Sequence, residues 1–191
     1  NSGIRIAVTA RIRRWRALNF LKKISQSIDY CIEKIGLAVA WLTTLMVLNV
    51  FYDVIMRYVF HRGNIAVQEM EWHLFSIIFL IGAAYALKKD AHVRVDIIYT
   101  RLSTKQKAWI DFFGTFLFLI PFSLIVIYAN KNFVGSSWSM REISPDPGGL
   151  PARYLLKAMI PLGFSLVIIQ GVSQAIKNFL VIIGKENEVA S

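Results

Sequence analysis

The stretch from Phe112 to Asn130 reads FFGTFLFLIPFSLIVIYAN and contains 19 residues without a charged side chain. A bilayer core is about 30 Å thick, so a helix that crosses it needs about 20 mostly apolar residues. Three further apolar blocks cover 35–52, 72–87 and 158–176. None of the four alternates like a strand or keeps the polar stripe of a soluble helix. Because a backbone in lipid must satisfy its own hydrogen bonds, each block is expected to form a spanning helix.

The composition points the same way. The 191 residues are 55% hydrophobic and 18% charged, whereas a soluble domain carries about 25% charged residues. Despite the formal net charge of +10, this apolar composition argues against a soluble nucleic-acid binder, so we expect no nucleic-acid partner. We predict an all-α integral membrane protein with a transmembrane domain over 35–184. Its four transmembrane helices are expected at about 35–57, 69–88, 109–130 and 156–183.

The basic residues flank the spans unevenly. Sixteen of the 22 Lys and Arg fall on one side of the membrane, namely before residue 35, in the loop 88–111 and from Lys177 onward. Loops rich in Lys and Arg remain in the cytoplasm. Both termini, including a tail at 185–191, are therefore predicted to be cytoplasmic.

The N-terminal segment, 1–34, combines apolar and basic residues with a helical period. We expect an amphipathic helix that precedes the spans and lies in the cytoplasmic membrane interface. Each basic residue near anionic lipid contributes about 1 kcal/mol to such binding. The side chains expected to contact the lipid surface are Arg11, Arg13, Arg14, Trp15 and Arg16. A disordered basic tail is the alternative interpretation.

The chain lacks the residue patterns of catalysis or cofactor binding. Only His73 of the three histidines falls within an apolar block, so a pair of axial haem ligands cannot form. The single Cys31 excludes an internal disulfide and the usual Cys/His zinc patterns. Ionisable residues lie near the ends of the blocks, which argues against a complete ion path in this chain. We therefore expect no enzyme and no cofactor or metal in this chain, and a role as a partner subunit.

Two polar groups flank the first loop. Asp53 and Arg57 are four residues apart, a good spacing for a helical ion pair. Glu69 and Glu71 open the second span, where a helix N-terminus favours negative charge. Arg57 could also reach Glu69 across the loop. These side chains are candidates either for contact with a partner subunit or for a brace that closes the helical hairpin.

The other two loops each contain a candidate site. In the second loop, His92 and Asp96 pair if the segment is helical, and otherwise lie in a solvated turn. The third loop is stiffened by proline and glycine, and we expect it to pack against another protein outside the membrane. Its defining residues are Pro145, Asp146, Pro147, Gly148 and Gly149.

Several short motifs resemble those of one transporter family. They are similar to the signature of the small, DctQ-like membrane subunit of TRAP (tripartite ATP-independent periplasmic) transporters, in the larger branch of such subunits. The motifs are RYVF at 57–60, QEMEWHLF at 68–75, GAAYAL at 82–87, HVRVD at 92–96, SPDPGGLP at 144–151 and PLGF at 161–164. The resemblance runs from about residue 28 to residue 183.

The resemblance implies a function. Such a chain is the small permease subunit of a sodium-coupled symporter in the bacterial inner membrane, which imports an organic acid anion delivered by a periplasmic substrate-binding protein. A large elevator-type membrane subunit holds the substrate and sodium sites, and the small subunit scaffolds it. Structural or interfacial roles are implied for Arg57, Glu69, Gly82, His92 and Asp96. The rival interpretations are the membrane anchor of a redox enzyme and a small autonomous exporter.

Overall fold

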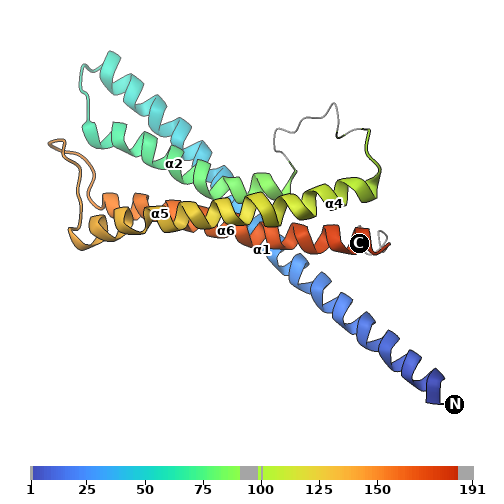
Figure 1. Ribbon diagram of the computed structural model, residues 1–191. Helices are drawn as coiled ribbons and strands as arrows, with labels where there is room; N and C mark the ends of the chain where they lie inside the picture. The colour runs from blue at the N-terminus through green and yellow to red at the C-terminus, as the bar shows by residue number, and fades with distance from the viewer. Residues whose placement is uncertain (1, 91–98, 100, 185–191) are drawn as a thin grey trace.

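The computed structural model describes the chain except for residues 1, 91–98, 100 and 185–191, and the side chains of 2–15 and 17. Its elements are α1 (Ser2–Tyr58), α2 (Ile65–Lys88), α4 (Thr104–Gly114), the π-helical η1 (Thr115–Leu119), α5 (Ile120–Ser139) and α6 (Arg153–Ile182) (Figure 1). The described residues contain no strand, so the all-α class is confirmed. Four helical rods are long and apolar enough to cross a membrane, namely Leu18–Tyr58, Ile65–Lys88, Thr104–Ser139 and Arg153–Ile182.

The helix ends follow from the local sequence. Asn64 caps α2 by accepting the Ala66 N–H with its side-chain oxygen at 2.9 Å. Ser103 and Gln106 form a reciprocal capping box at the start of α4. α6 begins directly after Ala152, whose left-handed backbone (φ 66°) turns the chain into the helix.

The rod Thr104–Ser139 continues past a proline by widening one turn. Pro121 has no N–H, so the carbonyl of Leu117 loses its usual α-helical donor and is crowded by the proline ring. The preceding turn, η1, takes π-helical spacing, in which the Ile120 N–H donates to the Thr115 carbonyl. α4, η1 and α5 therefore form one continuous spanning rod.

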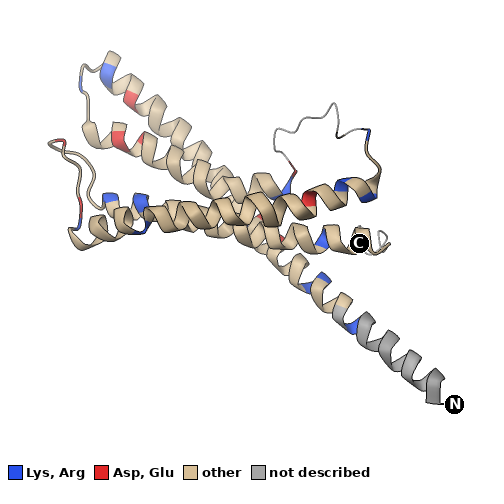
Figure 2. Ribbon diagram, in the orientation of Figure 1, with Lys and Arg blue, Asp and Glu red and all other residues tan. Residues whose placement is uncertain are grey.

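α6 lies at the centre of an open helical array. It packs against α1, α2, α4 and α5, and α1 also packs against α2 as a hairpin (Figure 1). Only 11–17% of the residues in the apolar window of each span are buried within the chain. Many apolar side chains of the spans are exposed, including Trp41, Phe79 and Phe118, which is unfavourable in water but not in lipid. Figure 2 shows charged residues towards the ends of α2 and on either side of a long uncharged stretch, 112–130, in the rod Thr104–Ser139.

Glycine lets two helices approach α6 closely. A Cβ at Gly163 would lie 2.6 Å from the carbonyl oxygen of Leu80 on α2, and one at Gly171 would lie 2.8 Å from Cδ2 of Leu119. Small residues at such points permit the van der Waals packing that drives helix association in lipid. α2 and the rod Thr104–Ser139 are both held against α6 in this way.

The expected arm, 1–34, and the expected first span, 35–57, belong to a single helix. α1 continues without interruption through this boundary, and its N-terminal part extends beyond the other helices (Figure 1). Leu18 and Ile32 are buried, so the later part of the expected arm packs into the array. Of the side chains expected to contact lipid, Arg16 is exposed, and those of Arg11, Arg13, Arg14 and Trp15 lie outside the described residues. Their contact with a lipid surface stays a prediction.

Candidate functional site

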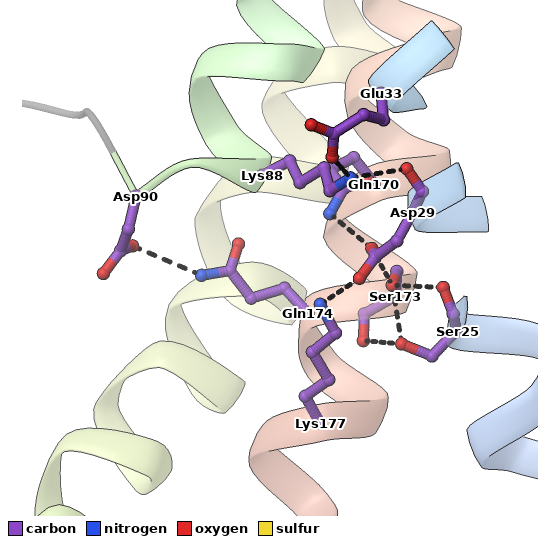
Figure 3. Close-up of polar contacts among 9 residues, drawn as sticks. All are labelled: Ser25, Asp29, Glu33, Lys88, Asp90, Gln170, Ser173, Gln174 and Lys177. Atoms are coloured by element: carbon purple, nitrogen blue, oxygen red, sulfur yellow. Dashed lines mark hydrogen bonds and ion pairs between the residues drawn. The ribbon is translucent and has the colours of Figure 1, made fainter. Parts of the chain in front are cut away.

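Where α1 crosses α6, polar side chains form what we call the Asp29 cluster, made of Ser25, Asp29, Gln170, Ser173 and Lys177 (Figure 3). Asp29 Oδ1 accepts hydrogen bonds from Ser173 Oγ at 2.8 Å and from Gln170 Nε2 at 3.1 Å. Asp29 Oδ2 pairs with the Lys177 ammonium group. Ser25, Gln170 and Ser173 are only 2%, 1% and 0% exposed. Because a hydroxyl has one proton, a Ser173 that donates to Asp29 accepts from Ser25 Oγ, 2.7 Å away.

A second set of contacts joins α1 to the end of α2. The Lys88 ammonium group donates to the Asp29 carbonyl at 2.7 Å and also pairs with Glu33. Lys89, just beyond α2, reaches Glu33 at 3.1 Å, and this hydrogen bond raises the pKa of Lys89. Charge-assisted bonds therefore tie α1, α2 and α6 together within about one turn of α1.

The sequence pattern did not predict the Asp29 cluster. It assigned residue 29 to an interfacial arm, 1–34, and therefore indicated no contacts between this residue and the spanning helices. A usable signal was nevertheless present in the sequence. Ser25 and Asp29 share one face of a helix, as do Gln170, Ser173 and Lys177 in the last span. Polar residues in register on two largely apolar helices indicate hydrogen bonding between those helices.

Near the start of α2, Glu69 fixes the loop between α5 and α6. The residue is 4% exposed, and its Oε1 accepts the Ser144 hydroxyl at 2.5 Å. Its Oε2 accepts the Leu150 N–H at 2.6 Å. The Arg153 guanidinium group lies 3.7 Å from Oε1 and over the Trp72 ring, 5.2 Å from the ring centroid. We call Glu69, Ser144, Leu150 and Arg153 the Glu69 cluster.

The loop has the backbone shape needed to reach this carboxylate. The Ser144 N–H donates to the Leu150 carbonyl at 3.1 Å, which closes a turn in which Gly148 is left-handed (φ 84°). A Cβ at Gly149 would lie 2.8 Å from Glu69 Oε2, so a larger residue here would push the loop away. The proline and glycine residues thus shape a turn around a buried carboxylate.

A second carboxylate holds the base of the loop. Glu142 pairs with Lys157 of α6, and its carbonyl accepts the Arg153 N–H at 3.0 Å. The hydrogen bond from Lys157 lowers the pKa of the Glu142 carboxyl group. The same ammonium group lies over the Phe133 ring of α5, 4.1 Å from the centroid. The loop is therefore attached to α2, α5 and α6.

The structure brings together some of the residues expected from the sequence. Asp53 is 3% exposed and forms the expected ion pair with Arg57. Glu69 engages Arg153 and the loop rather than Arg57. Glu71 is partly buried. Pro145, Asp146, Pro147 and Gly148 are exposed, Gly149 is partly buried, and His92, Asp96 and the tail 185–191 lie outside the described residues.

Neither cluster has the composition of a metal centre. Within the part of the chain that the structure describes, no group of three or more His, Cys, Asp and Glu side chains could hold a metal ion. The Asp29 and Glu69 carboxylates are instead engaged by hydroxyl, amide and basic groups. The contacts of the Asp29 cluster join α1 to α6, and those of the Glu69 cluster join α2 to the α5–α6 loop.

A family model for the DctQ component of tripartite ATP-independent periplasmic transporters matches residues 46–180. The chain belongs to this family. A relative from Haemophilus influenzae, described as a TRAP transporter small permease protein, is 29% identical over 106 residues, which is 56% of this chain and 66% of that protein. The ectoine TRAP transporter small permease protein TeaB of Halomonas elongata is 28% identical over 160 residues, which is 83% of this chain and 81% of that protein. The resemblance carried by the short motifs is thus confirmed.

Membership gives the two clusters a context. DctQ components are small permease subunits of transporters, not of an enzyme family, and they work with a large membrane subunit and a periplasmic binding protein. The matched region, 46–180, contains the Glu69 cluster and the α6 half of the Asp29 cluster. Ser25 and Asp29 precede it. The loop attachment therefore lies wholly within the family's common region, whereas the α1 attachment reaches beyond it.

Proposed function

We propose that this chain is a rigid scaffold for the large, elevator-type membrane subunit of a sodium-coupled TRAP transporter. The complex lies in the bacterial inner membrane, with both termini of the small subunit in the cytoplasm. It imports an organic acid anion by symport, and a periplasmic binding protein delivers that anion. The substrate and the sodium ions bind to the large subunit.

The observation that carries this proposal is an open array whose helices are fixed near both ends. The spans bury few of their own residues, which leaves a wide apolar surface for lipid or for a partner subunit. The Asp29 cluster ties α1 to α6, and the Glu69 cluster ties α2 to the α5–α6 loop. Alternating access requires one body to move against another. A cross-linked array with large exposed apolar faces suits the stationary body.

The buried and half-buried carboxylates of the spans also favour a scaffold over a transport path. An ion path uses ionisable residues that face a water-filled cavity within the membrane. Here the carboxylates already have partners: Asp29 pairs with Lys177, Asp53 pairs with Arg57, and Glu69 binds the α5–α6 loop. This engagement is our reason for assigning the sodium sites to the large subunit.

The two faces of the membrane receive different roles in this proposal. The α5–α6 loop faces the periplasm, where its exposed stretch at 145–148 contacts the binding protein. Since Glu69 holds the loop in place, little conformational entropy is lost on docking. The basic arm at 1–34 faces the cytoplasm and binds anionic lipids.

Reconstitution tests the proposal. Proteoliposomes that contain both membrane subunits, with the binding protein outside and an inward sodium gradient, are expected to take up a labelled carboxylate from a panel of organic acids. Vesicles that lack only this chain are expected to lose most of that uptake. Uptake at the normal rate without this chain would refute the scaffold role. Transport by this chain alone would favour an autonomous exporter, and a haem absorbance band would favour a redox anchor.

A further inference from the structure

An apolar groove lies between α2, α6 and the rod Thr104–Ser139. It has a volume of about 520 Å³, within the range of about 300–1,000 Å³ typical of small-molecule sites. Its walls include Leu87, Gly114, Phe118 and Phe122. All three surrounding rods are long and apolar enough to span a membrane, so in a bilayer the groove opens where acyl chains can enter it. An acyl chain matches both the shape and the chemistry of such walls.

One end of the groove is polar and carries negative charge. Asp111 and Gln174 line it, and the Gln174 amide nitrogen lies 3.5 Å from a carboxylate oxygen of Asp90. Figure 3 shows Gln174 extending from α6 towards Asp90. The Gln174 Oε1 atom is buried and has no hydrogen-bond partner in the described structure. A buried acceptor that lines the groove together with the Asp111 carboxylate suits a donor that is also a cation.

A basic side chain completes this end. Lys107 lies one helical turn before Asp111 on α4, and its ammonium group is 5.2 Å from the centroid of the Tyr99 ring. The Tyr99 hydroxyl donates to Asp111 at 2.6 Å, so the lysine and the carboxylate share this neighbour. The polar end of the groove thus has two acceptors, Gln174 and Asp111, that can bind a cationic group. Lys107, close to Asp111, can bind an anionic group.

We propose that the groove binds a phospholipid with a primary ammonium headgroup, of the phosphatidylethanolamine class. One acyl chain lies along Leu87, Gly114 and Phe118, the ammonium group donates to Gln174 and Asp111, and the phosphate faces Lys107. A primary ammonium group has three N–H donors, whereas a choline headgroup has none. An anionic lipid without an ammonium group can place its phosphate near Lys107, but it has no cation to donate to Gln174 and Asp111. This inference rests on the chain spanning a membrane and not on its transport partner or substrate.

Photocrosslinking of the purified complex, with both membrane subunits present, tests this site. Three probes carry the same diazirine-labelled acyl chain on phosphatidylethanolamine, phosphatidylcholine or phosphatidylglycerol headgroups. The ethanolamine probe is expected to label peptides from 110–122 at least about tenfold more than the choline probe, because a hydrogen bond between charged groups is worth at least that factor. Asp111→Asn is expected to reduce this preference.

A matched pair of variants locates the lipid. Gly114 lines the groove and a Cβ there would meet nothing within 4 Å, so Gly114→Leu adds its side chain to the groove with open space for the first carbon. Labelling of 110–122 is expected to fall to background in this variant. Gly135→Leu is the control, because Gly135 has equally open surroundings in a different groove of α5, and it is expected to label normally. Equal labelling by the three probes, a preference for phosphatidylglycerol, or unchanged labelling in Gly114→Leu would each overturn the proposal.

Discussion

Removing the Asp29 carboxylate is expected to loosen α1 from α6. Asp29 accepts hydrogen bonds from Gln170, Ser173 and Lys177. Hydrogen bonds between helices in lipid contribute about 0.6 kcal/mol each on average. Asp29→Ala is therefore expected to lower the free energy of unfolding by about 2 kcal/mol. The Lys177 side chain is 33% exposed, so its ammonium group can turn to water when the carboxylate is gone, which keeps the loss near that value.

The measurement is reversible unfolding of the purified complex in mixed micelles with increasing SDS. A double-mutant cycle with Lys177→Met isolates the ion pair, because methionine keeps most of the chain length without the charge. We expect a coupling energy of about 0.6 to 1.7 kcal/mol. Asp146→Ala is the control, since it removes an exposed loop carboxylate and is expected to change the unfolding free energy by less than about 0.5 kcal/mol.

Two results would refute this reasoning. An unfolding midpoint in Asp29→Ala equal to that of the unmodified chain would show that the cluster does not hold α1 in place. Strictly additive effects of Asp29→Ala and Lys177→Met would show that the two side chains do not interact. In either case, the segment before the first apolar block would be independent of α6.

Limited proteolysis of the loop 144–151 is expected to be faster in Glu69→Ala than in the unmodified chain. Glu69→Gln is expected to increase the rate much less, because the amide oxygen still accepts the Leu150 N–H. Equal cleavage rates in the two variants would contradict the attachment of the loop to residue 69. The pair between Glu142 and Lys157 makes the loop sensitive to acid. The pKa of Glu142 is lowered from its ordinary value of 4.5, so the ion pair stabilises the loop fully above pH 4.5 and is lost as the pH falls below that value. Cleavage of the loop by an acid-active protease is therefore expected to accelerate below pH 4.5. The acceleration is expected to be smaller in Glu142→Gln, which has no carboxylate to protonate. Gly163→Ala is expected to lower the thermal midpoint of the complex, because its Cβ would lie 2.6 Å from the Leu80 carbonyl oxygen, whereas Gly135→Ala has open space and is not. An unchanged midpoint in Gly163→Ala would show that α2 and α6 can separate slightly without a loss of stability.

Local features of the fold could be predicted from the sequence. Each long apolar block became a spanning rod, because a charge-free stretch of that length has one stable backbone in lipid. The pair between Asp53 and Arg57 followed from its four-residue spacing, which any helix converts into proximity. In both cases, the controlling information lies within a few residues of the feature itself.

Long-range features could not be predicted in this way. Glu69 meets Ser144 across 75 residues and Leu150 across 81, and nothing near Glu69 in the sequence specifies those partners. The continuity of α1 through residue 35 was missed for a different reason. Basic residues before residue 35 suggested a separate arm, yet no proline or interior glycine between residues 4 and 35 supplies a helix end. The lack of a helix-breaking residue predicted the continuous helix, whereas the change from basic to apolar residues wrongly suggested a boundary.

The unbroken course of α1 has a mechanical consequence. At 1.5 Å per residue, its 57 residues measure about 85 Å, nearly three times the thickness of a bilayer core. The contacts with α6 near Asp29 and with Lys88 of α2 anchor this helix partway along its length. Because no break in the helix lies between the anchor and either end, the overhanging end and the end beside α2 belong to one stiff element.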